Sequence, residues 1–217
     1  QTNGSYIIKN EEDFNAIQDM NGIYRIESDI ILHNPKPIGS FSEPFTGTII
    51  GALNGDIKNK PTITIATDNN FTGLVTFLNG GTIKNLILEG TIKSEENKVS
   101  GFVNCAKKGK LIDCVNRANI NCTYNGTGDC YVGGMIAFMS APTEFQISGC
   151  QNTGNITCVG GQNGYVGGIG GYLIFSNDTG YITQSDNSGN IETKVKNVGG
   201  IAGYLSTVQP VSFCSNQ

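Results

Sequence analysis

Apolar and polar residues alternate through the second half of the chain in runs of roughly five residues, and no run of ten or more there keeps a helical spacing. Apolar positions such as Ile147, Ile156 and Val166 stand between polar neighbours, and glycine-rich stretches separate the runs. A period of two is typical of β-strands with one buried face. The pattern therefore predicts an all-β chain.

A glycine-rich segment recurs along the second half of the chain. Its copies are SGFVNCA (100–106), GGMIAFM (133–139), GGIGGYL (167–173) and GGIAGYL (199–205), with an earlier copy around Gly73. Aligned glycines of the four copies are spaced by 33, 34 and 32 residues. A second segment recurs with a similar period, as IDCVNRANI (112–120), SGCQNTGNI (148–156) and QSDNSGNI (184–191).

A period of this length indicates a solenoid, a propeller or a repeat array. The unit is shorter than a propeller blade of about 40 to 45 residues. It suits one coil, about 33 residues long, of a right-handed parallel β-solenoid whose coils stack roughly 4.8 Å apart. Glycines would let the chain turn at coil corners. A phosphate-binding loop is excluded because the glycine cluster recurs with no helix after it.

Stacked coils would place equivalent residues in columns. The predicted columns are Ile92, Ile120, Ile156 and Ile191; Leu86, Cys114, Cys150, Ser185 and Cys214; and Leu88, Asn116, Asn152, Asn187 and Asn216. We expect the first two columns to face inward. The asparagines are expected at a corner, with their amides bonded to the backbone of the next coil, in a structural role.

The N-terminal region differs from the repeats. The stretch NEEDFNAIQDM (10–20) predicts a short amphipathic helix, with Asn10 as N-cap and Phe14, Ile17 and Met20 on one face, that would cap the end of the solenoid. We expect a cap and first strands over 1–60 and solenoid repeats over 61–217, as one continuous domain. Because the last repeat stops partway, we expect a piece of a longer protein.

The sequence resembles the GLUG-repeat β-helix family. The resemblance rests on YIIKNEEDFNAIQDMNGIYRIESDIIL, PIG, PFTGTIIG, GGTIKNLILEGTI, and the repeats VGGMIAF, VGGIGGY and VGGIAGY with their C-x-N-x-G-N-I-like partners. It covers nearly the whole chain. GALNGDIKNK replaces the family's usual Asp-Gly-Asn-Gly-His element. The resemblance implies a right-handed parallel β-helix and a surface, adhesive or scaffold role, as in surface proteins and the N-terminal part of IgA-specific metallopeptidases, and it supplies no catalytic residues.

Composition narrows the environment of the protein. Charged residues make up 15% of the chain and the net charge is −4, with no dense basic run beyond AKKGK, so nucleic acid is not an expected partner. No apolar run is long enough to insert into a membrane. Seven cysteines and six Asn-x-Ser/Thr sequons favour a secreted or cell-surface glycoprotein. The expected N-glycosylation sites are Asn125 and Asn177 first, then Asn70, Asn121, Asn155 and Asn3.

Candidate chemistry is sparse. His33 is the only histidine and stands in an expected loop, so neither a zinc motif nor a nucleophile–histidine pair is predicted. No repeat column holds two carboxylates. We therefore expect no enzyme activity and no metal or cofactor. The alternative is a carbohydrate-active β-helix enzyme, or an accessory β-helix domain of a larger secreted protease.

The cysteines allow two interpretations. Their spacing does not match a zinc knuckle. Cys122 and Cys158 occupy equivalent positions beside turn residues in neighbouring coils, which favours a disulfide. Cys114 and Cys150 are also equivalent, and there we favour buried free thiols that act as small apolar residues.

An aromatic column is the candidate binding site. The same position in three consecutive coils is held by Phe138, Tyr172 and Tyr204, and by Cys105 in the coil before them. Apolar columns flank this position on both sides. Alternation would turn these rings outward, where they could stack on sugar rings or on a partner protein. The alternative is that the rings pack under a loop or lie inward at a corner. The expected function is a non-catalytic adhesin or extracellular scaffold that binds a protein or glycan, or self-associates.

Overall fold

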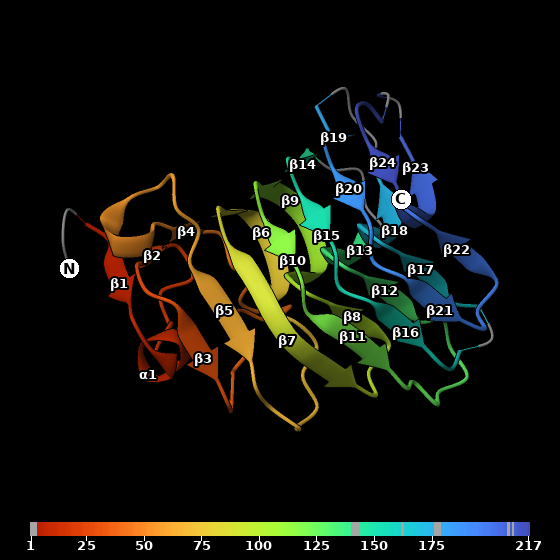
Figure 1. Cartoon of the computed structure of the whole chain (residues 1–217), viewed down its shortest axis with the longest axis horizontal. Coiled ribbons are helices and arrows are strands. Elements are labelled where there is room, and N and C mark those ends of the chain that lie inside the picture. Colours follow the sequence, from red (N-terminus) through yellow and green to blue (C-terminus); the bar gives the residue numbers. More distant parts are fainter. Residues whose placement is uncertain (1–3, 140–143, 162, 176–178, 208, 210) are drawn as a thin grey trace.

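The chain forms an all-β structure in which strands from successive repeats pair in parallel (Figure 1). The computed structural model describes residues 4–139, 144–161, 163–175, 179–207, 209 and 211–217. Within these residues every pair of neighbouring strands is parallel, and the strands advance from the N-terminal end of the molecule to the C-terminal end. No helix in the described part is long and apolar enough to cross a membrane.

The described strands belong to three sheets. The first contains β1 (Tyr6–Ile8), β2 (Ile23–Ile26), β4 (Thr48–Gly51), β6 (Val75–Lys84), β9 (Val103–Ile112), β13 (Ile136–Met139), β14 (Phe145–Ser148), β18 (Gly170–Ile174), β19 (Tyr181–Thr183) and β23 (Ala202–Ser206). The second contains β3 (Ile30–Leu32), β5 (Thr62–Ile65), β7 (Ile87–Ser94), β10 (Val115–Asn116), β11 (Asn119–Cys122), β15 (Gln151–Asn152), β16 (Ile156–Cys158), β20 (Asp186–Asn187), β21 (Ile191–Thr193) and β24 (Ser215–Asn216). The third contains β8 (Lys98–Ser100), β12 (Tyr131–Gly133), β17 (Tyr165–Gly167) and β22 (Asn197–Gly199).

The register of these strands confirms the predicted columns. Ile120 pairs with Ile92 on one side and with Ile156 on the other, and Ile156 pairs with Ile191. The backbone N–H groups of the repeated glycines donate to the equivalent glycine of the next repeat, as in the 3.0 Å bond from Gly168 to the Gly200 carbonyl. The repeat spacing therefore sets which residues stack.

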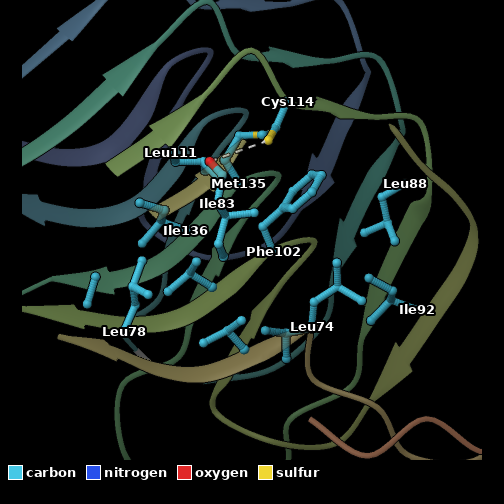
Figure 2. Packing of buried hydrophobic residues seen from close by; sticks show 14 of the residues in the cluster. Leu74, Leu78, Ile83, Leu88, Ile92, Phe102, Leu111, Cys114, Met135 and Ile136 are labelled. Carbon is cyan, nitrogen blue, oxygen red and sulfur yellow. Dashed lines mark hydrogen bonds between the residues drawn. The ribbon is translucent and has the colours of Figure 1, made fainter. Parts of the chain in front are cut away.

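The buried hydrophobic residues form one cluster that runs along the stack. Figure 2 shows Leu78 and Ile83 of the first sheet and Leu88 and Ile92 of the second around Phe102, which is fully buried. The thiols of the predicted inward cysteine column lie in this cluster as well, and the Cys114 thiol donates to backbone carbonyls. The column is therefore inward-facing, as predicted.

The asparagine column is also buried, and its bonding differs from the prediction. Each amide nitrogen donates to the side-chain oxygen of the next asparagine, at 2.7 Å from Asn116 to Asn152 and 2.8 Å from Asn152 to Asn187. Each amide nitrogen also donates to the backbone carbonyl two residues later in the same repeat, as Asn152 does to Gly154 at 2.9 Å. The partners are thus side chains of the next repeat and backbone of the same repeat, because the column lies inside rather than at an exposed corner.

One end of this asparagine ladder is incomplete. Leu88 pairs with Asn116 and offers no amide. The Asn116 Oδ1 atom is consequently a buried side-chain oxygen without a hydrogen-bond partner among the described residues. At the other end the ladder reaches Asn216, which accepts from Asn187 at 2.7 Å.

The predicted N-terminal helix is shorter than expected. The helix α1 covers Glu11–Asn15, and the Asn10 side chain accepts from the Asp13 N–H as an N-cap at 2.8 Å. It ends at Asn15 with Ala16 as its C-cap and does not continue to residue 20, and the Met20 carbonyl accepts the N–H groups of Thr46 and Gly47, at 2.8 and 2.7 Å. The helix lies near β1 and β3 at the N-terminal end of the stack (Figure 1). A single 3-10 turn, η1, covers Leu53–Gly55.

Candidate functional site

Two columns of aromatic rings meet on the outside of the C-terminal half. The first is the predicted column, Phe138, Tyr172 and Tyr204, on the in-register strands β13, β18 and β23. The second consists of Tyr131 and Tyr165, which pair across β12 and β17. We call these five residues the aromatic corner. They lie outside the hydrophobic core cluster, and Tyr204 is 42% exposed.

Paired glycines at the ends of β12, β17 and β22 bring the two columns together. A Cβ atom on Gly133 would overlap the carbonyl oxygen of Ile136, so the chain bends tightly there. Gly167 meets the Gly170 carbonyl and Gly199 the Ala202 carbonyl in the same way. Because of this bend, the tyrosine ring before the glycines contacts the ring after them, as Tyr131 contacts Phe138.

The rings are packed in an ordered arrangement. Within the columns they stack, with centroids 5.5 Å apart for Tyr131 and Tyr165 and 4.5 Å apart for Tyr172 and Tyr204. Between the columns they meet edge to face, as Tyr165 and Tyr172 do at 5.0 Å and 81°. Such contacts stabilise ring pairs by about 0.5 to 1.5 kcal/mol beyond burial. The corner is therefore a preorganised aromatic surface.

The phenols of Tyr131 and Tyr172 are held in their neutral form. Burial among the rings, followed by the nearby Asp129 carboxylate, raises the pKa of Tyr131 to about 12. The Tyr131 hydroxyl donates to Asp129 Oδ2 at 3.2 Å. Burial and then the neighbouring Tyr204 raise the pKa of Tyr172. Both hydroxyls consequently remain hydrogen-bond donors across the physiological pH range.

The flanking apolar columns face inward, as the alternation suggested. Met135, Met139, Ile169 and Leu173 are fully buried, so the rings between them are left on the outside. Sequence reasoning missed Tyr131 and Tyr165, although the recurring Tyr-Val-Gly-Gly segments carried a signal. It also missed Phe77, which pairs with Cys105 and lies in the same column two strands before Phe138.

The predicted disulfide is not formed in the structure. Cys122 and Cys158 are in register on β11 and β16, and both are free. The Cys158 sulfur instead lies 3.6 Å from the Cys130 sulfur, in a group of three buried thiols. Hydrogen bonds from Cys158 lower the pKa of Cys122 and of Cys130, and the same bonds raise that of Cys158. Sequence spacing did not reveal Cys130 as a neighbour.

The free thiols give a countable prediction. All seven cysteines have free thiols in the structure. Six of them are buried, and Cys214 is partly exposed. Burial also raises the pKa of Cys150 to about 12, which disfavours the reactive thiolate. We expect 5,5′-dithiobis(2-nitrobenzoic acid) to titrate no more than one thiol in the folded protein and seven after denaturation. A denatured count of five would instead support one disulfide.

The remaining predicted residues are scattered. Asn70, Asn125 and Asn155 are exposed and Asn121 is half-buried, whereas Asn3 and Asn177 lie outside the described residues. His33 is exposed. Within the described part of the chain, no group of three or more His, Cys, Asp or Glu side chains is placed to hold a metal ion.

Comparison with known proteins gives one similarity. The chain is 33% identical over 92 residues to Halomucin from Haloquadratum walsbyi, a match that covers 41% of this chain and 1% of that protein. No family model matches the chain. No solved structure matches it significantly.

Proposed function

We propose that the chain is a right-handed parallel β-solenoid with about 33 residues per coil, of the GLUG-repeat kind. The support is the in-register parallel pairing of residues one repeat apart in all three sheets, such as Val132 with Val166 and Val166 with Val198. In a solenoid each coil contacts only its neighbours, so a motif that recurs in every coil forms a column of similar side chains along the surface.

The function we propose is that of a non-catalytic binding module of a secreted or cell-surface protein, which engages a glycan or protein through the aromatic corner. One observation carries this proposal. Three stacked rings outside the core form a continuous surface across three repeats, from the half-buried Phe138 and Tyr172 to the exposed Tyr204. Exposed clusters of this kind are typical of interaction sites. The exposed sequons support the extracellular setting.

Removal of the outer rings tests this function. Tyr172→Ala and Tyr204→Ala together should abolish binding on an array of neutral and acidic oligosaccharides, and lower the free energy of unfolding by only about 1 to 2 kcal/mol, because the rings stack outside the core. Tyr6→Ala is the matched control, since Tyr6 is an outer ring stacked on Tyr24 far along the chain from the corner. Retained binding in the double variant, or unfolding that accounts for the loss, would contradict the proposal.

A further inference from the structure

The outer aromatic column has one missing ring. Along the paired strands, the residues of this column follow in the order Phe77, Cys105, Phe138, Tyr172 and Tyr204. Cys105 therefore stands where the other four strands carry a ring. Cys105 is only 4% exposed, and its side chain is much smaller than a ring. A pocket of about 280 Å³ lies at this position, with Phe77, Phe138 and Cys105 among its lining residues.

The dimensions of this pocket suit one flat ring. Phe77 and Phe138 are two strands apart, which corresponds to roughly 9.6 Å at the usual strand spacing. A ring midway between them would lie about 4.8 Å from each, inside the 4.5 to 7 Å range of ring stacking. Phe41, whose ring stacks on Phe77 at 5.0 Å, is 65% exposed and extends the wall on that side. The floor is apolar, since burial raises the pKa of the Cys105 thiol to about 11 and keeps it neutral.

A positive charge stands at the edge of the pocket. The Lys98 ammonium lies 5.3 Å from the Phe138 ring centroid and 5.5 Å from that of Tyr131. Lys98 makes no ion pair among the described residues, and Lys107 lines the same pocket. An unpaired, half-buried ammonium favours an anionic group on the ligand.

Hydrogen-bonding groups adjoin the pocket. A second hollow of about 320 Å³ shares Phe41, Lys98 and Cys105 with the first, and its wall adds the neutral residues Thr72, Thr76 and Asn104 together with the acidic Glu96. Asn104 donates to the Thr72 hydroxyl oxygen at 2.6 Å, which leaves the Thr72 hydroxyl proton free to donate. The Thr76 hydroxyl has no partner in the described part of the chain. Together these groups suit the hydroxyls of a sugar better than an aromatic side chain.

We propose that this gap in the aromatic column is a subsite for an anionic sugar, a hexopyranose that carries a carboxylate. The apolar face of the ring stacks between Phe77 and Phe138, the carboxylate faces Lys98, and the ring hydroxyls face Thr72 and Thr76. The proposal rests on the proposed binding function and adds the ligand class and the position of its charged residue.

Calorimetric titration with a hyaluronan tetrasaccharide and with its methyl ester tests the subsite. The two probes share one sugar backbone, and in the second a neutral methyl ester group replaces each charged glucuronate carboxylate. We expect the acidic form to bind at least about tenfold more tightly, and Lys98→Gln to remove that difference without affecting the ester. Cys105→Tyr, which supplies the missing ring, should abolish binding of both probes, and Cys105→Ser should not.

The outcomes separate this inference from the proposed function. If Cys105→Tyr binds like the wild type while Tyr172→Ala and Tyr204→Ala lose binding, the corner binds glycans but the gap is not a subsite. If the acidic probe does not bind the wild type at millimolar concentration, the inference is wrong. Binding of N-acetylphenylalaninamide in place of either sugar would mean that the gap accepts an aromatic side chain, and would also overturn it. A thermal melt of each variant shows that it is folded.

Discussion

Replacing Asn152 with aspartate should lower the free energy of unfolding by about 4 kcal/mol at pH 7. The Asn152 side chain is fully buried, and its nitrogen donates to both the Gly154 carbonyl and the Asn187 side-chain oxygen. Aspartate has nearly the same shape, so it creates no cavity. It places a carboxylate oxygen against two acceptors, removes two donors and buries a charge without a cationic partner.

The loss in this variant should depend on pH. Burial raises the pKa of a carboxyl group, so the folded-state pKa of the new side chain should lie above the unfolded value of about 3.9. The variant is then most stable below that unfolded value, and it loses stability as the pH rises through the raised folded-state pKa. Urea denaturation at several pH values, with the wild type as reference, measures this dependence.

Asn216→Asp is the matched control for the ladder. Asn216 is exposed and only accepts, from the Asn187 nitrogen, and an aspartate oxygen accepts as well. Its stability should change by less than about 0.5 kcal/mol. Equal effects at the two positions, or a loss at Asn152 that does not vary with pH, would show that the buried ladder does not hold the repeats together as described.

The columns could be predicted because the same motif recurs in each repeat, and parallel pairing places equivalent motif positions side by side even though the repeats differ in length. The pairing of Ile120 with Ile156 and of Ile156 with Ile191 is as expected, because each isoleucine occupies the same position of its repeat. What the asparagines bond to could not be predicted, because stacked amides can satisfy either the neighbouring backbone or one another. That choice depends on whether the column lies inside, where no water competes.

The candidate site shows a similar limit. The alternation of Met135, Phe138 and Met139 indicated an outer ring, but the contact between Phe138 and Tyr131, at 4.5 Å, depends on the bend between them. Sequence spacing gives no angle for such a bend. The pocket at Cys105 was equally hidden, because a small residue in an aromatic column creates space only if the rings on both sides stay in register.

The paired glycines explain why the inside and outside of the repeats are coupled. A Cβ atom on Gly134 would lie 2.5 Å from the Asn152 amide carbon, and one on Gly168 would overlap the Asn187 amide. The second glycine of each pair therefore lies against the asparagine ladder, while the first lies against the backbone of the strand that follows the bend. One dipeptide thus makes room both for the ladder and for the bend that brings the rings together.

Gly168→Ala should consequently destabilise the protein by about 3 kcal/mol or more, because its Cβ would overlap both the Gly200 carbonyl oxygen and the Asn187 side chain. Neither neighbour can move freely, since the Gly200 carbonyl accepts from the Gly168 N–H and Asn187 bonds two other asparagines. Chemical denaturation gives the magnitude. The far-ultraviolet circular dichroism spectrum shows whether the strands remain.

Gly128→Ala is the control for the loss of glycine flexibility itself. The nearest atom to its added Cβ is the Tyr124 hydroxyl oxygen at 3.4 Å, an ordinary contact in an exposed loop, so the change should be within about 0.5 kcal/mol. If Gly168→Ala were as mild as Gly128→Ala, the glycines would serve only the turn. A loss confined to Gly168→Ala means instead that close packing of the glycine on the asparagine ladder fixes the register on which both the aromatic corner and its missing ring depend.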